Sequence, residues 1–212
     1  MRTIHAWFAV PTLALLLTGA DDPTRFATPP TPPKFAPPAS GVLFADDFSG
    51  DLARWKADSA ESWTVWRRML RADLPDRKQA RSFLYAGSEE WTDYALDFDV
   101  CGMRGVDKGG AIRVQGTTGF AIDLRGGTYQ DVVAHIRQWP VGKARVTNAN
   151  GTWSHVRIEA RRDRFRVFVN GELKIERVDA RCPAGRMALA AYTGGIGKCT
   201  VYYDNVVVTK LD

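Results

Sequence analysis

Residues 153–171 read WSHVRIEARRDRFRVFVNG, and this stretch decides the fold class. Apolar and charged residues alternate through two runs within it. A period of two is typical of a β-strand with one buried and one solvent-facing side. Asn170-Gly171 ends the second run, and the alternation resumes at Leu173. Asn-Gly between alternating runs is the strongest short signal for a β-hairpin, so the stretch predicts antiparallel strands.

The same alternation recurs on both sides of this hairpin, while helical periodicity is weak throughout. Further strands are predicted at 62–67, 82–86, 94–100, 110–115, 119–125, 131–138, 186–192 and 198–209. Many short strands separated by turn residues predict an all-β fold, a two-sheet antiparallel β-sandwich of the jelly-roll type. The seven Trp, ten Phe and six Tyr agree with this, because aromatic side chains pack well on pleated sheets.

Composition and charge exclude several classes of protein. Of the 212 residues, 45% are hydrophobic and 25% are charged, as in an average globular protein. This excludes a disordered, a collagen-like and a polytopic membrane chain. Lys and Arg number 29 against 24 acidic residues, a net charge of +5 that is spread along the chain. Nucleic-acid binders concentrate their charge in one patch, so no nucleic-acid partner is expected.

The N-terminus predicts export. Arg2 precedes an uncharged, largely apolar run that is too short to span a bilayer, and small residues end it at Ala20. We expect residues 1–20 to be a signal peptide, 21–40 a proline-rich linker, and 41–212 one domain without a membrane span. An uncleaved anchor is the alternative. Either way the domain is expected in the periplasm, the cell envelope or outside the cell.

Two segments carry a family resemblance. The hairpin with Trp153 and Asn170-Gly171 is similar to the "W-x-x-V-x-I … V-x-V-N-G" hairpin of concanavalin-A-like (laminin-G-like) jelly rolls. Residues 185–189 and 203–208 resemble the ending of the same superfamily. The resemblance covers about 42–210 and is most similar to the 3-keto-disaccharide hydrolase-type domain and its non-catalytic relatives. It implies the fold more strongly than the function, because this fold carries lectins, glycosidases and adhesion modules.

Three functions are compatible with this resemblance. Glycosidases of the superfamily need closely paired carboxylates, and the strand with Asp97 and Asp99 lacks the first acid of their pattern. We interpret these two as solvent-facing charges, which favours a non-catalytic, exported domain that binds a poly- or oligosaccharide. A hydrolase or lyase of the 3-keto-disaccharide hydrolase type is the alternative, with Asp123 and His135 available for acid–base chemistry. A structural cell-envelope domain without a sugar ligand is the third.

The resemblance places a sugar site on the concave sheet, on strands near 110–138. Sugars bind through an apolar ring face on an aromatic side chain and through polar groups on their hydroxyls. Arginines there would favour anionic sugars. The predicted carbohydrate-binding residues are Arg113, Gln115, Asp123, Arg125, Tyr129, His135, Arg137 and Trp139.

A structural calcium ion is implied by relatives that tie the first and last strands together through acids. Asp46, Asp47 and Asp204 match those places, and hard oxygen ligands suit Ca²⁺. The alternative is that Asp204 bonds a turn without metal.

Three cysteines leave the disulfide pairing open. Export permits a disulfide, and three single pairings of Cys101, Cys182 and Cys199 are possible. Cys182 and Cys199 bracket the last predicted hairpin, which favours a bond between these two.

Overall fold

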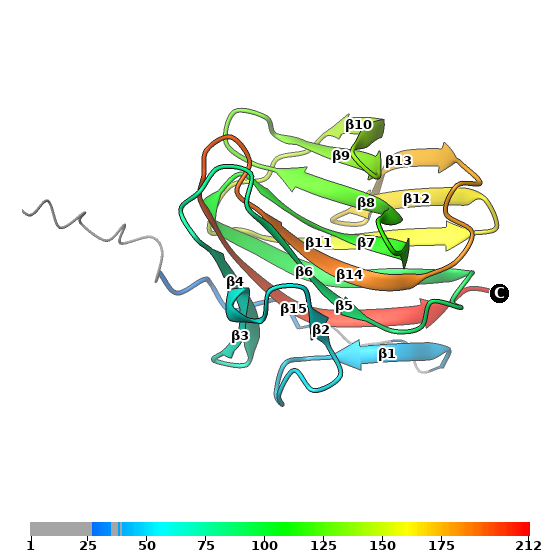
Figure 1. Cartoon of the computed structure of the whole chain (residues 1–212), viewed down its shortest axis with the longest axis horizontal. Helices are drawn as coiled ribbons and strands as arrows, with labels where there is room; N and C mark the ends of the chain where they lie inside the picture. The colour runs from blue at the N-terminus through cyan, green and yellow to red at the C-terminus, as the bar shows by residue number, and fades with distance from the viewer. Residues whose placement is uncertain (1–26, 35–37, 39) are drawn as a thin grey trace, which may run out of the picture.

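The computed structural model describes residues 27–34, 38 and 40–212, so the predicted signal peptide lies outside the described residues. The described chain forms two antiparallel sheets packed face to face (Figure 1). This confirms the predicted all-β sandwich. Nowhere in the described ranges is there a helix with the length and apolar character needed to cross a bilayer.

One sheet has eight strands and the other has seven. The eight-stranded sheet runs β13-β12-β11-β6-β15-β4-β3, with β1 also paired to β15. Its strands are β1 (Val42–Asp46), β3 (Trp63–Trp66), β4 (Met69–Leu74), β6 (Tyr94–Gly105), β11 (Trp153–Arg161), β12 (Arg164–Val169), β13 (Glu172–Val178) and β15 (Cys199–Lys210). The seven-stranded sheet runs β10-β9-β8-β7-β14-β5-β2. Its strands are β2 (Lys56–Ala57), β5 (Arg81–Ala86), β7 (Asp107–Gln115), β8 (Thr118–Arg125), β9 (Asp131–Ile136), β10 (Trp139–Arg145) and β14 (Arg186–Tyr192); a 3-10 turn, η2 (Ala60–Ser62), precedes β3.

The hairpin predicted around Asn170-Gly171 forms as expected. Strands β12 and β13 pair so that Val169 faces Glu172 across the two-residue turn. Both turn residues have positive φ, 51° at Asn170 and 82° at Gly171. Asn and Gly tolerate this conformation, and its backbone twist matches that of the two strands.

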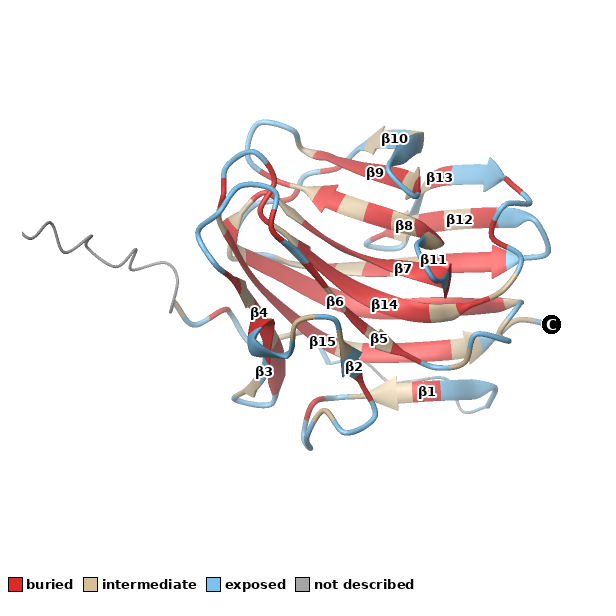
Figure 2. Ribbon diagram, viewed as in Figure 1, coloured by how far each residue is buried: buried red, intermediate tan, exposed pale blue. Residues whose placement is uncertain are grey.

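The core lies between the two sheets, where the buried stretches of the central strands face each other (Figure 2). The rings of Phe120 and Phe165 stack across it with centroids 4.4 Å apart. Tyr203 crosses from the eight-stranded sheet, and its hydroxyl donates to the carbonyl of Ala190 and accepts the N–H of Gly109. Such contacts fix how the two sheets sit on each other, and thereby the shape of their outer faces.

Arg113 does not lie on an outer face, in contrast to its predicted place in the sugar site. It is 1% exposed and has a φ of 51°. The register of β7 against β8 shifts between Ile112 and Gln115, and this bulge turns Arg113 inward. Its guanidinium donates to main-chain carbonyls of three loops and to the Asp93 carboxylate. We therefore remove it from the candidate site.

The predicted Cys182–Cys199 disulfide is also not formed, because all three cysteines are free and buried. The carbonyl of Cys182 accepts from Arg113 near the end of β7, whereas Cys199 contacts Asp107 at its beginning. Asp107 and Arg113 are six residues apart along β7, which corresponds to a distance of about 20 Å. A disulfide needs Cα atoms within about 7 Å, so this pairing is excluded by the fold.

Candidate functional site

Three of the predicted sugar-binding residues share the outer face of the seven-stranded sheet, which we call the open face. Asp123 and Arg125 lie on β8, and His135 lies on β9 next to it. The β8 residues on either side of Asp123 are fully buried, so the alternation turns these side chains away from the core. The predicted alternation of this region is therefore correct at β8 and β9.

A pocket of about 690 Å³ opens at the margin of this face, and we call it the rim pocket. It brings together Arg125, His135 and Trp139 from the predicted set. Trp139 begins β10 and is 66% exposed. The other lining residues come from β9, β10 and the end of β13 with the loop after it, and they are Val133, Pro140, Val141, Gly142, Lys143, Arg177 and Arg181.

Arg125 is held in a fixed orientation beside this pocket. Its Nε and Nη2 donate to the two carboxylate oxygens of Asp131, at 2.7 and 2.8 Å. The Tyr129 ring lies under the guanidinium, 4.4 Å from ring centroid to Cζ. Burial of Asp131 raises its pKa, but hydrogen bonds from Arg125 and Lys143 outweigh this and hold the pKa below its usual value. Tyr129 therefore positions Arg125, which is a different role from the predicted direct contact with sugar.

An acid–base group adjoins the rim pocket on the open face. His135 Nε2 lies 3.0 Å from Asp123 Oδ2. Asp107 on β7 faces Arg125 in the sheet register. Burial, together with the charge of Asp123, raises the pKa of Asp107 to about 6. Asp107 was not among the predicted residues, because the predicted strand began at residue 110 and left it outside the alternation.

The middle of the open face is made of residues with little or no side chain. Gly109 pairs with Ala190, and Ala111 pairs with both Ala188 and Ala121. The aromatic rings of Phe83 and Tyr85 border this floor on β5, stacked with centroids 6.0 Å apart. The floor was not predicted from the sequence. Its signal is that the alternate positions 109, 111, 188 and 190 carry only Gly or Ala.

Two further predicted residues lie outside the rim pocket. Gln115 ends β7 and donates its side-chain amide to the carbonyl of Glu89. Arg137 lies in the turn between β9 and β10 with a φ of 57°, and its Nε donates to Thr118. Both side chains bond other segments of the domain in this structure.

The predicted calcium ligands lie around a different cavity, and their geometry does not fit a cation. Asp46 accepts from the Phe48 N–H and from the indole of Trp55. Asp47 accepts from the Ser49 N–H, and Asp204 accepts from the N–H of the next residue. No three acidic, His or Cys side chains converge within the described ranges. Each carboxylate bonds its own turn, which is the alternative left open for Asp204, so we assign no metal to this set.

Comparison with known proteins identifies the family. Residues 41–209 match the family described as the 3-keto-alpha-glucoside-1,2-lyase-like domain. The chain belongs to this family. The match spans most of the chain and confirms the resemblance seen in the sequence. No curated protein matches the chain.

Solved structures similar to this lyase-like domain share its fold at low identity. The carbohydrate-binding module CBM66 from Bacillus subtilis is 15% identical, with a TM-score of 0.64 over 75% of this chain and 97% of that one. The Crh5 transglycosylase in complex with NAG is 14% identical, with a TM-score of 0.63 over 84% and 89% of the two chains. The VIP36 exoplasmic/lumenal domain, in a Ca²⁺/Man-bound form, is 12% identical, with a TM-score of 0.57 over 74% and 83%. At these identities the likeness shows the jelly-roll fold alone.

Proposed function

We propose that the chain is an exported, sugar-binding jelly-roll domain that recognises a poly- or oligosaccharide on the open face of its seven-stranded sheet. The observation that carries this proposal is the rim pocket, where the exposed indole of Trp139 stands beside Arg125 and His135. Neighbours named as a carbohydrate-binding module and as a mannose-bound domain support it. Export rests on the sequence of residues 1–20.

The rim pocket supplies both parts of a sugar site. The indole of Trp139 offers a flat apolar surface for the C–H face of a pyranose ring. Arg125 is already fixed by Asp131, so little side-chain entropy is lost when it binds a hydroxyl or carboxylate. Lys143, Arg177 and Arg181 add positive charge at the same margin, and with Arg125 they outnumber the two carboxylates that they pair with, Asp131 and Asp179. A preference for acidic sugars follows from this excess of cations, and the affinity would then fall as salt rises.

Trp139→Ala tests this proposal. We expect the affinity for the recognised glycan to fall about tenfold or more, because a large aromatic side chain at the centre of a binding site contributes on the order of 2 kcal/mol. Binding to a panel of neutral and acidic glycans, measured by calorimetry at two salt concentrations, gives both the ligand class and the effect of the substitution. Trp66→Ala, on β3 of the other sheet, is the matched control.

The outcomes separate the candidate functions. Binding of a glycan that stays intact, and that is weakened by Trp139→Ala, supports the sugar-binding domain. Equal affinity of Trp139→Ala and the unchanged chain would move the site away from the rim pocket. Failure to bind any glycan in the panel would contradict the proposal and favour the structural envelope domain.

A second candidate is the 1,2-lyase reaction named in the family description, and the acid–base group favours it. In such an elimination a base removes the proton at C2, which the neighbouring ketone acidifies. The freed electron pair forms the C1=C2 bond as the C1–O bond breaks, and the leaving oxygen takes a proton from an acid. His135, held by Asp123, suits the base. Asp107, with its pKa raised to about 6, suits the acid.

For this candidate we expect Asp107→Asn to lower the turnover of a 3-keto-α-glucoside by about 10²–10⁴-fold. The rate of the unchanged chain should fall above about pH 6, because Asp107 must be protonated to donate. Release of the leaving alcohol, followed over pH 5–8, measures both effects. Trp139→Ala should instead raise the KM. Binding without turnover at any pH would eliminate the lyase and leave the binding domain intact.

A further inference from the structure

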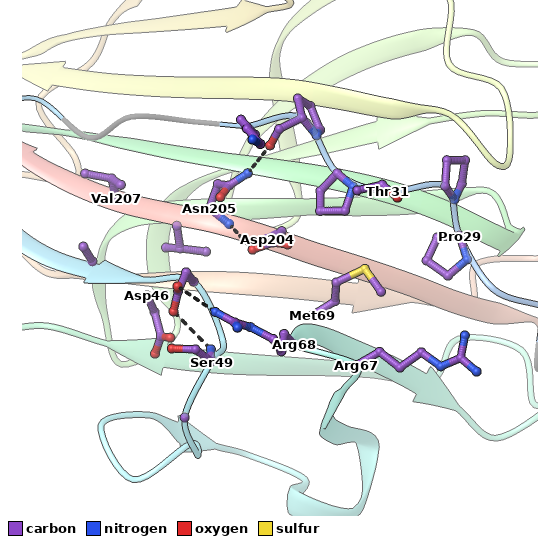
Figure 3. Close-up of a pocket in the computed structure, with 18 of the residues that line it drawn as sticks. Pro29, Thr31, Asp46, Ser49, Arg67, Arg68, Met69, Asp204, Asn205 and Val207 are labelled. Carbon is purple, nitrogen blue, oxygen red and sulfur yellow. Dashed lines mark hydrogen bonds and ion pairs between the residues drawn. The ribbon is translucent and has the colours of Figure 1, made fainter.

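Part of the predicted proline-rich linker lies against the domain. Residues 28–34 read TPPTPPK, and we call them the proline strap. Pro29 is buried, and the strap forms one wall of a cavity of about 1250 Å³ on the outer side of the eight-stranded sheet. The other walls come from the end of β1 with the loop that follows it, the β3–β4 turn and β15. Figure 3 shows the strap passing beside Asn205 and Asp204.

Two side chains of the sheet bond the main chain of the strap. The indole Nε1 of Trp153 donates to the carbonyl of Pro30 at 2.7 Å. The side-chain amide of Asn205 donates to the carbonyl of Pro33 at 2.8 Å, as drawn in Figure 3. The two carbonyls are three residues apart, which is one turn of a polyproline II helix. A chain of this kind has no internal hydrogen bonds, so its carbonyls are free to accept from a partner.

The spacing of the two donors across the strands is close to this repeat. Trp153 lies on β11 and Asn205 on β15, with β6 between them. Two strand spacings are about 9.6 Å, and one polyproline II turn rises about 9.3 Å. In the register of the sheet Trp153 is level with Tyr202, because both pair with Cys101, so the two donors are also offset by three residues along the strands and the strap crosses the strands obliquely.

The donor at Asn205 is built into a buried network. Its amide also donates to Asp99 Oδ2 at 2.7 Å, so both of its N–H groups are used. Asp99 is 1% exposed and is bonded as well by His155 Nδ1 at 2.8 Å. Asn205 itself has a φ of 52°, a conformation that Asn adopts more readily than most residues. Asp99, which its sequence pattern predicted to be a solvent-facing charge, is instead buried and positions a donor that contacts the strap.

We propose that the outer face of the eight-stranded sheet is a polyproline II-binding surface, and that its occupant is the chain's own residues 28–34. The surface uses the general mode of proline-rich recognition, in which aromatic side chains and fixed donors bind a preformed extended helix. It is separate from the open face, because the two lie on the outer sides of different sheets. The strap would hold the N-terminal arm on the side opposite the sugar site, so that a domain tethered through this arm presents its open face outward.

The test uses the full chain and a labelled peptide of residues 27–34. In one variant of the chain, Pro29, Pro30, Pro32 and Pro33 are replaced by Gly, which weakens the attached occupant. We expect the peptide to bind this variant and not the unchanged chain, since a segment attached in place competes at an effective concentration near mM. Fluorescence anisotropy with tens of µM chain measures the difference.

Two further substitutions, made in the glycine-substituted chain, locate the surface. Trp153→Phe keeps an aromatic side chain but removes the indole N–H. Asn205→Gly keeps the positive φ but removes the side-chain amide. Each is expected to weaken peptide binding about fivefold, the loss of one hydrogen bond. Trp66→Phe, on the edge strand of the same sheet, is the matched control and should leave binding unchanged.

Each remaining outcome overturns the proposal. Equal binding to both chains would show that the strap does not occupy the surface. Binding to neither would show that the surface has no affinity for such a segment. Binding that is unaffected by Trp153→Phe and Asn205→Gly would place the peptide elsewhere. None of these results bears on glycan binding at the rim pocket, so the two proposals stand or fall separately.

Discussion

Arg113→Ala should lower the free energy of unfolding by about 3–5 kcal/mol, a shift in the melting temperature of roughly 10 °C. The side chain is 1% exposed and stacks 5.3 Å from the Phe165 ring centroid. It donates to the carbonyls of Thr92, Arg162 and Cys182 and to the Asp93 carboxylate. Its loss would leave a cavity and several buried acceptors without donors, and an acceptor stripped of its partner costs more than the bond contributed.

Chemical denaturation of Arg113→Ala beside Gln115→Ala measures this effect. Gln115 lies two residues along the same strand and is exposed, so its substitution should change the free energy of unfolding by less than about 0.5 kcal/mol. Arg113→Lys is a second comparison. Lysine keeps the charge but cannot donate in four fixed directions, so most of the loss should remain. A cost below 1 kcal/mol for Arg113→Ala would contradict the role that we assign to this residue.

The second large effect is on the free energy of unfolding, which should fall by about 2 kcal/mol between pH 5 and pH 7.5. This figure allows for the partial exposure of the three titrating side chains that cause it. Burial, with the charge of a nearby Asp in each case, raises the pKa of Asp107 and of Asp204 to about 6 from 3.8. Hydrogen bonds to Asp97 and Asp99 raise the pKa of His155 to about 9 from 6.5.

All three shifts act in the same direction. A group whose pKa is higher in the folded state binds its proton more tightly there, so protonation stabilises the fold. For the two carboxyls this stabilisation is complete below about pH 4 and is lost as the pH rises through 6. For His155 it is complete below pH 6.5 and is lost between 6.5 and 9. Burial lowers the pKa of Lys108 to about 8, which has the opposite sign but acts mainly above this window.

Urea unfolding at half-unit steps of pH resolves these contributions. Asp107→Asn combined with Asp204→Asn should flatten the curve between pH 5 and 6. His155→Gln should flatten it above pH 6.5, and each variant should leave the other part of the curve unchanged. A stability that stays constant, or that rises from pH 5 to 7.5, would refute the assignment.

Period-two patterning predicted most strands, because one buried face imposes alternation on every half-buried strand. Strand β4 was not predicted, although Leu70, Ala72 and Leu74 alternate with Arg71 and Asp73. Strand β10 was also not predicted, because Pro140 and Gly142 interrupt its alternation. The predicted strand began at residue 110, which left Asp107 outside it and part of the floor of small residues unrecognised.

The sequence by itself determined the fold class, the hairpin at Asn170-Gly171 and the outward facing of Asp123, Arg125 and His135, since all of these follow from local alternation and turn chemistry. Only the tertiary structure decided the rest. The bulge in β7 turned Arg113 inward, the length of β7 separated Cys182 from Cys199, and the sheet order brought Pro30 to Trp153 across 123 positions of sequence. Bulges, register and cross-sheet contacts depend on which strands become neighbours, and a pattern with a period of two residues carries no information about neighbours.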